Sequence, residues 1–505
     1  MSRREVLRCL SAIVPAGYLW GYANTAIGSV MASANGDSIK NAIYLLNRWC
    51  WGPSPQDLTR FLQQGQAAFL QGQFSSSTQD DLPPRVAARI RAMKIESASL
   101  PELYAASREA AAQSPNAEQR KKAFRAAAST LLREAEERAA LRAVHSTRQL
   151  EDRLTWFWLN HFSVYRGKAN IAIFLADYEK SIRARVFGKF KNLLQAAVLH
   201  PAMLVYLDNN QNKVGKINEN LARELMELHT LGVDGGYSQD DVRNLAGVLT
   251  GLEVDFFYKK KNHTQSSSGF ESEMTRMVKS QHDSSEKMLL GKPVRGRGQD
   301  EVFMALDMLA GHPSTAKHIS TKLVIFFVSD RPPASLVETC AHTFLSTDGD
   351  LPSVLRTIFS SQEFSESLGR KAKLPVAFIY SAFRMLATRD ANLAEASVIN
   401  SYLSMLGQPL FGCMTPNGYA LTADQWLGPG QLTQRFDVAR AIAATKIRDN
   451  KKQRTESVEG LSNVLLSSAI GEKIFSQASL AAIRGSKSKE EELIYLMASP
   501  EFNRE

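Results

Sequence analysis

Apolar side chains recur along most of this chain at every third or fourth position, which is the spacing of an amphipathic α-helix. Two short helices are predicted at residues 37–48 and 54–64, with Asp37 as the N-cap of the first and Pro55 in the first turn of the second. A long helix with a charged, solvated face is predicted at residues 118–143. Clear alternation of strands and helices is absent. The pattern therefore predicts a mainly α protein, a large multi-helix globular fold with long loops and little or no β-sheet.

Aromatic side chains are dense between residues 150 and 207, a pattern more typical of a hydrophobic core than of a cofactor pocket. Residues 323–328 have the composition of a buried strand, but helical patterns flank them, so a helix is predicted there. Residues 258–300 break the periodicity. They are rich in Lys, Ser, Gly and His and exceed the length of an ordinary connection, which predicts a long polar loop that is functional or without fixed structure.

The first 34 residues have the layout of an export signal. The twin arginine Arg3-Arg4 precedes an apolar run at residues 12–21, and Ala32-Ser33-Ala34 fits an Ala-x-Ala cleavage site. This layout predicts a twin-arginine (Tat) signal peptide, read by the Tat translocase, which moves folded chains and often serves proteins that receive a cofactor in the cytoplasm. We therefore expect a periplasmic or secreted protein. An amphipathic helix on the membrane surface is the alternative interpretation of these residues.

These changes in pattern divide the chain into four regions. They are a signal peptide at residues 1–34, an N-terminal helical region at 35–149, a helical core at 150–445 that includes the 258–300 loop, and a C-terminal helical region at 446–505.

Composition narrows the classes of partner. The 505-residue chain carries 61 Lys and Arg against 51 Asp and Glu, a formal net charge of +10, which suits anionic envelope polymers but also serves solubility. No basic stripe is interleaved with aromatics, so nucleic acid is not an expected partner. After the signal, no apolar run approaches the ~18 residues of a membrane span, and no stable span is expected. Cys50, Cys340 and Cys413 allow at most one disulfide, and buried thiols are expected.

Residues 218–232 contain the densest group of ionisable side chains and have capping residues at both ends, as a helix does. Asn218 suits the N-cap, and Gly232 suits the position just after the last turn. A rotation of 100° per residue places His229 within the apolar arc and the charged side chains on the opposite face. The polar face holds Glu219, Asn220, Arg223, Glu224 and Glu227.

This geometry limits what the helix binds by itself. Glu224, Glu227 and His229 do not share a face, so they cannot ligate one metal ion without residues from elsewhere. A solvated ion-pair ladder is one interpretation of Glu219, Arg223 and Glu227. The alternative is that the acidic face lines a cavity, where its carboxylates hold a divalent metal ion or act as acid and base. For His229 the simpler interpretation is a hydrogen-bonded core histidine.

Residues 218–251, NENLARELMELHTLGVDGGYSQDDVRNLAGVLTG, resemble the signature of the bacterial domain-of-unknown-function 1800 family. Further blocks agree along nearly the whole mature chain: LNRWCWGPSPQDL at 46–58, FWLNHFSV at 157–164, HPAMLVYLDN at 200–209, HPSTAKHISTKLVIFFVSDRPP at 312–333 and SPEF at 499–502. The resemblance implies a largely helical, typically exported protein whose activity is not established. Members are often encoded beside sulfatase-like proteins with Tat signals, so the resemblance also implies a sulfatase-like partner.

The resemblance reaches the polar loop as well. His282-Asp283 and Lys287 match a family pattern of His-Asp, then a glycine, then a lysine, but Ser285 stands where the glycine is usual, which puts the tight turn in doubt. His161 matches the family's Asn-His-Phe. A buried, hydrogen-bonded ring for His161 and a solvated ring for His282 are the simpler interpretations. The functional hypothesis has Glu224 and Asp283 as catalytic residues and His161, Glu219, Glu227 and His282 as metal ligands, with Asn218, Asn220, Arg223 and His229 completing the polar cluster.

Three hypotheses follow. The first is an exported, non-catalytic envelope protein with an accessory or structural role, working with a sulfatase-like partner; it requires an exposed acidic ladder. The second is a metal-dependent hydrolase or oxidoreductase loaded before export, which requires His161, residues 218–227 and residues 282–283 to converge on one cavity beneath the 258–300 loop. The third is an envelope-polymer binding module. Motifs of zinc proteases, serine hydrolases, kinases, c-type haem proteins and dinucleotide enzymes are absent, so no cofactor is identified beyond that divalent metal.

Overall fold

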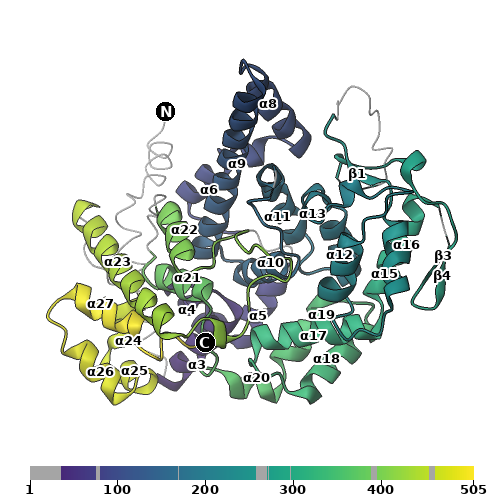
Figure 1. The fold of residues 1–505 in the computed structure, drawn as a ribbon. Helices are drawn as coiled ribbons and strands as arrows, with labels where there is room; N and C mark the ends of the chain where they lie inside the picture. The colour runs from purple at the N-terminus through teal and green to yellow at the C-terminus, as the bar shows by residue number, and fades with distance from the viewer. Residues whose placement is uncertain are drawn as a thin grey trace, which may run out of the picture.

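A computed structural model describes residues 36–75, 80–168, 170–257, 270, 272–295, 297–387, 395–453 and 461–505. These residues form a mainly helical structure with two small pairs of strands (Figure 1). The predicted mainly α fold is therefore confirmed. The predicted signal peptide at residues 1–34 lies outside the described residues.

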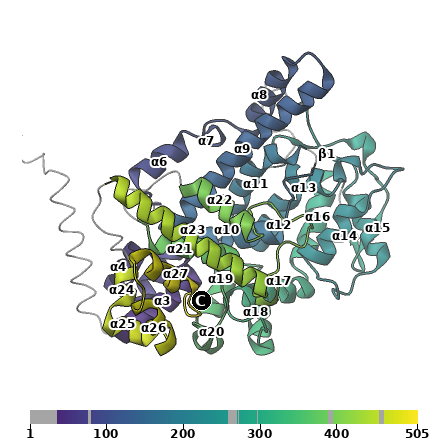
Figure 2. The ribbon, with the colours of Figure 1, turned by 60° about the vertical axis from the view of Figure 1, so that its left-hand side comes forward.

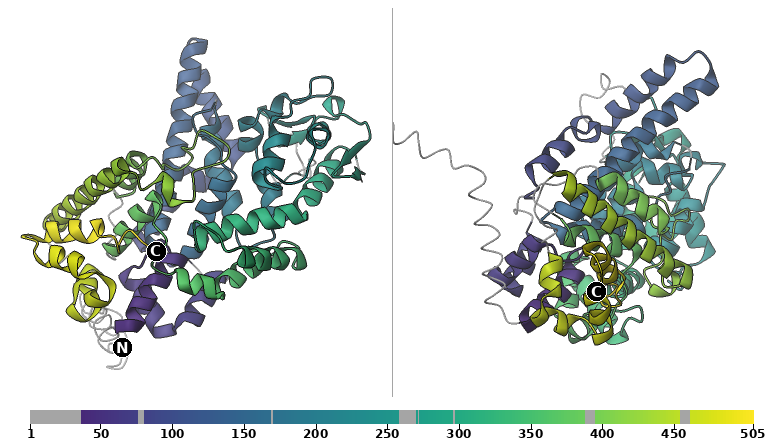
Figure 3. Two further views of the ribbon diagram at one scale, coloured as in Figure 1. Left: turned by 60° about the horizontal axis from the view of Figure 1, so that its bottom comes forward. Right: turned by 90° about the vertical axis from the view of Figure 1, so that its left-hand side faces the viewer.

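The helix that starts at Pro55 begins where the sequence predicts, but Asp37 lies inside the first turn of the helix Gly36–Trp49, so the prediction that Asp37 is its N-cap is wrong. The Ser54 hydroxyl accepts a hydrogen bond from the backbone N–H of Asp57, and Pro55 occupies the first helical position. The long helix predicted at residues 118–143 is present, and it pairs with the preceding helix as an arm that projects from the molecule (Figures 1 and 3). These helices are α3 (Gly36–Trp49), α4 (Pro55–Gln64), α5 (Gln66–Phe74), α6 (Pro84–Arg91), α7 (Lys94–Ser97), α8 (Leu100–Ala112) and α9 (Ala117–His145).

The central helices surround a core in which aromatic side chains pack among aliphatic ones, and the dense aromatics are core residues, as predicted. Trp158, Phe162 and Tyr178 are fully buried. The elements are α10 (Gln149–His161), the 3₁₀ turn η2 (Ile171–Phe174), α11 (Leu175–Arg183), α12 (Phe190–Val198), α13 (Pro201–Tyr206), η3 (Asn209–Gln211), α14 (Asn220–Glu224), the π-helical turn η4 (Leu225–His229), α15 (Gln239–Val248) and α16 (Gln299–Ala310).

The described part of the loop predicted at residues 258–300 contains regular structure, and one strand of it pairs with a strand that precedes the loop. Strands β1 (Leu252–Val254) and β2 (Thr275–Met277) pair antiparallel, and β3 (Lys287–Leu289) pairs antiparallel with β4 (Lys292–Val294). The 3₁₀ turn η6 (Lys279–Gln281) lies between the two pairs. Thr275 is buried, and its hydroxyl donates a hydrogen bond to the Leu199 carbonyl, so tertiary contacts order a segment that lacks periodicity. Residues 258–269 lie outside the described residues.

The helices after residue 312 complete the fold. Residues 323–327 are helical, as predicted, and α23 continues through the boundary predicted between residues 445 and 446 (Figure 2). These elements are α17 (Pro313–Phe327), α18 (Ala334–Ser346), α19 (Leu351–Phe359), α20 (Gln362–Ser367), α21 (Pro375–Met385), α22 (Glu395–Met405), η7 (Ala423–Gln425), α23 (Pro429–Gln453), α24 (Leu461–Leu466), α25 (Ser468–Ile474), α26 (Gln477–Arg484) and α27 (Lys489–Ala498).

Buried arginines tie the two ends of the described chain together. Helix α3 packs against α25 (Figure 1). Arg153 is 1% exposed; it donates hydrogen bonds to the carbonyls of Asn47 and Cys50 and pairs with the carboxylate of Glu505 at 3.1 Å. Arg48 donates to the Phe327 carbonyl at 2.8 Å. Glu505 is therefore part of the core.

The structure shows the state of the cysteines and whether any described helix could span a membrane. Cys50, Cys340 and Cys413 are free thiols, and the first two are buried. Burial raises the pKa of Cys50 to about 12, so that thiol stays protonated and unreactive. No helix in the described part of the chain is both long and apolar enough to cross a membrane.

Candidate functional site

The signature segment is not one continuous α-helix. Helix α14 is capped by Glu219 rather than by the predicted Asn218; the Asn218 side chain instead accepts a hydrogen bond from the backbone N–H of Asn220. After five residues the helix widens into the π-helical turn η4, and the Thr230 hydroxyl donates to the Leu225 carbonyl. A π-helical turn shifts the faces that 100° per residue assigns, and such turns are frequent at functional sites. Gly232 ends the segment with φ +86°, as the sequence predicts.

The acidic ladder of this segment faces solvent. Glu219 pairs with Arg223 at 2.8 Å, and their side chains are 31% and 40% exposed. The same Glu219 carboxylate accepts a hydrogen bond from Gln239 at 2.8 Å and lies 3.7 Å from Arg243. The Asn220 amide donates to the Leu207 carbonyl at 3.3 Å. Exposed pairs of this kind contribute little to stability, and these side chains do not line the cavity of about 660 Å³ between α11, α12 and α16.

Glu224 and Glu227 lie half-buried beside the ladder. Burial raises the pKa of Glu224, and the neighbouring charge of Glu227 raises it further. No hydrogen bond within the described part of the chain engages either carboxylate.

His161 and His229 meet in the core beside His318 of α17. The ring centroids of His161 and His229 are 5.7 Å apart, and those of His161 and His318 are 6.2 Å apart. His161 donates through Nε2 to the carbonyl of His229 at 3.1 Å, and His318 donates through Nε2 to the carbonyl of Leu228 at 3.1 Å. Because carbonyls only accept, Nε2 carries the proton in both rings. Both histidines therefore satisfy carbonyls at the end of η4 that lack a helical partner.

The three imidazoles are uncharged near neutral pH. Burial lowers the pKa of His229 to about 3 and of His318 to about 4, and it holds the pKa of His161 well below its usual range. Lys322, one turn after His318, adds positive charge to the cluster, and burial lowers its own pKa to about 8. His229 is fully buried, and neither of its ring nitrogens has a hydrogen-bond partner in the described structure.

His282 belongs to a different network, a buried ion cluster at the start of the strand pair β3–β4. It donates through Nδ1 to the Thr250 carbonyl at 2.9 Å and through Nε2 to the Glu301 carboxylate at 2.9 Å. Lys287 reaches the same carboxylate at 3.2 Å and donates to the Asp283 carbonyl at 2.6 Å. The hydrogen bond to Glu301 raises the pKa of His282, which favours the imidazolium. The side chains of His282 and Lys287 thus both pair with the buried Glu301 carboxylate, and these pairs hold residues 282–287 against α16.

The turn that Ser285 put in doubt is made without glycine. The Asp283 carboxylate accepts a hydrogen bond from the backbone N–H of Ser285 at 2.9 Å, as in an Asx turn. Ser285 is not among the residues with positive φ, so a side chain costs nothing there. Burial alone would raise the pKa of Asp283, but its hydrogen bonds with Ser285 lower it. Asp283 therefore acts as a turn cap.

The predicted site residues thus occupy three separate networks. No hydrogen bond, ion pair or ring contact in the described structure joins His161 to the His282 cluster or to the Glu219 ladder. Among the described residues, no three His, Cys, Asp or Glu side chains are placed to hold a metal ion. His161 and His229 are the only two of the ten predicted residues whose rings the described structure brings into contact.

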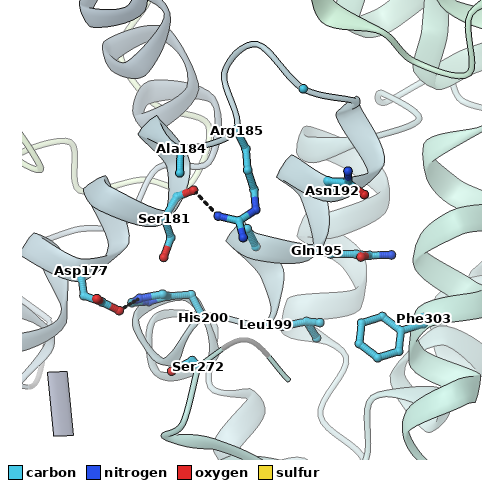
Figure 4. Close-up of a pocket in the computed structure, with 12 residues that line it drawn as sticks. Asp177, Ser181, Ala184, Arg185, Asn192, Gln195, Leu199, His200, Ser272 and Phe303 are labelled. Carbon is cyan, nitrogen blue, oxygen red and sulfur yellow. Dashed lines mark hydrogen bonds and ion pairs between the residues drawn. The ribbon is translucent and has the colours of Figure 1, made fainter. Parts of the chain in front are cut away.

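A sizeable cavity lies elsewhere, between α11, α12 and α16, and it was not predicted from the sequence. It has a volume of about 660 Å³. Figure 4 shows Asp177 and Ser181 on one side and Asn192 and Gln195 on the other, with Phe303 at one end. The polar positions 177, 181 and 185 recur at the helical spacing of four, a signal that the dense aromatics of this region concealed.

Asp177, His200 and Ser181 have the composition of a catalytic triad, but their hydrogen bonds exclude that role in this arrangement. His200 accepts from the backbone N–H of Ala202 through Nδ1 at 3.1 Å, so its proton lies on Nε2, which donates to Asp177 at 3.1 Å. Both ring nitrogens are occupied, and neither is left to accept a proton from Ser181. Burial raises the pKa of Asp177, but the hydrogen bond from His200 outweighs it and lowers the pKa.

Comparison with known proteins gives a family and no activity. No curated protein and no solved structure matches the chain. The profile of one family, described as a protein of unknown function (DUF1800), matches residues 44–504. That match covers α4 to α27 together with the polar cavity and all three networks, so the chain belongs to the DUF1800 family.

Proposed function

We propose that this protein is an exported, non-catalytic envelope protein that acts by binding rather than by chemical conversion. One observation carries the proposal: most of the candidate chemical groups are already used inside separate networks of the fold. Glu219 is paired on the surface, His282 is clamped to Glu301, and His161 satisfies a helix-end carbonyl. Acid–base or metal catalysis needs such groups to meet, unengaged, at one position.

The same fold is consistent with export through the Tat translocase to the periplasm or the exterior. Arg153 pairs in the core with Glu505, 352 residues further along the chain, so this part of the core forms only when remote segments have folded together. A route that carries folded chains fits a protein built in this way. The sulfatase-like partner is part of the proposal and rests on the family resemblance alone.

Metal analysis of the full chain tests the non-catalytic proposal against a metal-dependent hydrolase or oxidoreductase. The protein is purified from the cytoplasm of an export-blocked strain, and its metal content is measured together with the free energy of unfolding before and after chelation. We expect less than one equivalent of metal and no effect of the chelator. Glu224→Gln and His282→Ala are expected to leave the metal content unchanged, as is the control Glu338→Gln on the exposed face of α18.

A stoichiometric metal ion that is lost in Glu224→Gln or His282→Ala, but not in Glu338→Gln, would overturn the proposal. Glu224→Gln keeps the shape of a half-buried side chain that makes no hydrogen bond to any described residue, so this variant remains informative if His282→Ala unfolds. Co-purification from the envelope fraction tests the partner, and recovery of the protein without a sulfatase-like protein contradicts that part of the proposal.

A further inference from the structure

Two adjoining cavities form one groove along α11. The cavity of about 660 Å³ and a second of about 210 Å³ are both lined by Asp177 and Ser272. The larger one alone falls within the roughly 300–1,000 Å³ typical of ligand sites. The groove therefore has room for an extended ligand with Asp177 at its middle.

The charged side chains that line the groove sum to a net charge of zero. Arg185 and Lys180 contribute two positive charges, and Asp177 and Glu273 contribute two negative charges. A site for an anion or a cation concentrates one sign of charge. The balance favours a ligand that is polar but uncharged.

The groove also offers polar groups that the protein does not use. In the described structure, the Ser181 hydroxyl and the Asn192 amide make no hydrogen bond with the rest of the chain. Gln195 donates to Asp307 at 2.9 Å, which fixes the amide and leaves its carbonyl oxygen free to accept. Hydroxyl and amide groups both donate and accept, which matches the hydroxyl groups of a sugar. Phe303 adds an aromatic face at one end (Figure 4), which suits the C–H face of a sugar ring.

The walls of the groove are held in place before any ligand arrives. His200 is fixed by the backbone of α13, and it in turn fixes the carboxylate of Asp177. On the opposite face of α11, the buried carboxylate of Glu179 pairs with Arg183 at 2.6 Å and with Arg138 of α9. A preorganised site loses little conformational entropy on binding.

We infer that this groove binds a segment of a neutral glycan, with Asn192, Gln195 and Ser181 hydrogen-bonded to its hydroxyls and Phe303 against a sugar ring. The inference rests on the proposed function and gives that function a ligand class. It separates this protein from one that recognises acidic polymers through its net positive charge.

The test uses the full chain and four tetrasaccharide probes. Chitotetraose, cellotetraose and maltotetraose are neutral, and tetragalacturonate is the charged comparison. Saturation-transfer NMR and titration calorimetry measure binding at millimolar ligand. At least one neutral probe is expected to bind more tightly than tetragalacturonate.

Phe303→Ala is expected to weaken that binding at least tenfold, and Asn192→Ala several-fold. Met304→Ala, one residue further along α16 and outside both cavities, is the matched control and is expected to bind as the wild type does. Thermal unfolding of each variant establishes that the fold is kept; both target side chains lie at the surface of the groove, so unfolding is not expected.

The outcomes separate this inference from the proposed function. Absence of binding by all neutral probes, tighter binding of the charged probe, or binding that Phe303→Ala and Asn192→Ala leave unchanged would overturn the glycan site. Cleavage of a bound tetrasaccharide, seen by chromatography of the mixture, would overturn the non-catalytic proposal and would leave the glycan site standing.

Discussion

Replacing Glu179 by glutamine tests the energetics of the helix that carries one wall of the groove. Glu179 is 2% exposed, and its carboxylate accepts hydrogen bonds from Arg183 at 2.6 Å and from Arg138, which is itself buried. Burial alone would raise the pKa of Glu179, but the charges of Arg138 and Arg183 outweigh burial and lower the pKa from 4.5 to about 2. Glu179→Gln keeps the size of the side chain and removes a charge that both guanidinium groups share, while Arg138 keeps Glu96 and Arg183 keeps Asp152 as further partners.

The lowered pKa of Glu179 sets the expected loss in the free energy of unfolding. At 1.36 kcal/mol for each pH unit, lowering the pKa from 4.5 to about 2 corresponds to about 3 kcal/mol of stabilisation of the folded state. Removing one partner of a buried ion pair costs about 3–5 kcal/mol, and the remaining carboxylates Glu96 and Asp152 place this variant at the lower end of that range. We therefore expect Glu179→Gln to lower the free energy of unfolding by about 3 kcal/mol at pH 7.

The dependence on pH distinguishes this cause from a packing defect. The pKa is lower in the folded state, so the contribution of Glu179 is complete above about pH 5 and is lost as the pH falls toward 2. Urea unfolding followed by circular dichroism should show a difference between wild type and Glu179→Gln that falls by more than half between pH 7 and pH 3. The exposed control Glu338→Gln should stay within about 0.5 kcal/mol of wild type. A difference that is the same at both pH values would refute the electrostatic account.

Three further predictions concern single side chains. His229→Leu is expected to reduce the loss of stability in acid. The pKa of His229 in the folded state is about 3, below the usual 6.5, so the unfolded state takes up a proton first as the pH falls. His229 alone therefore lowers the free energy of unfolding of the wild type by about 2 kcal/mol between pH 7 and pH 5, which urea unfolding measures. Glu301→Gln is expected to leave two buried cations without their carboxylate and to speed amide hydrogen exchange in β3 and β4; unchanged exchange there would contradict the clamp. Gly418→Ala is expected to lower the melting temperature, because its φ is +75° and its Cβ would overlap the Asn160 carbonyl, whereas Gly428→Ala has open space and should melt as wild type does.

Most helices were predictable because their signals are local. Ser54 and Pro55 mark the start of α4 by hydrogen bonding and φ within four residues. The Ala-, Glu- and Arg-rich stretch that became α9 is helical by the propensity of its own residues. The cap of α14 was assigned one residue too early, because Asn218 forms a local turn with Asn220 before the helix begins.

The candidate site was harder to predict because it depends on contacts between distant segments. Grouping His282 with His161 followed from their chemistry, but packing joins His282 to Glu301 and joins His161 to the end of η4. The groove is lined by Asp177 of α11, by His200 at the start of α13 and by Phe303 of α16, which lies more than a hundred residues further along the chain. Its polar spacing along α11 was visible in the sequence, but nothing local distinguishes a groove from a solvated helix face.

The sequence by itself determined that this is a helical protein of the DUF1800 family, with many helix ends set by capping residues. Tertiary structure alone decided which charges are buried and which partners they find. The physical reason is one of range: capping and helical periodicity act over a few residues, whereas the pairing of Arg153 with Glu505, or of Glu179 with Arg138, exists only when remote helices pack and exclude water from both partners.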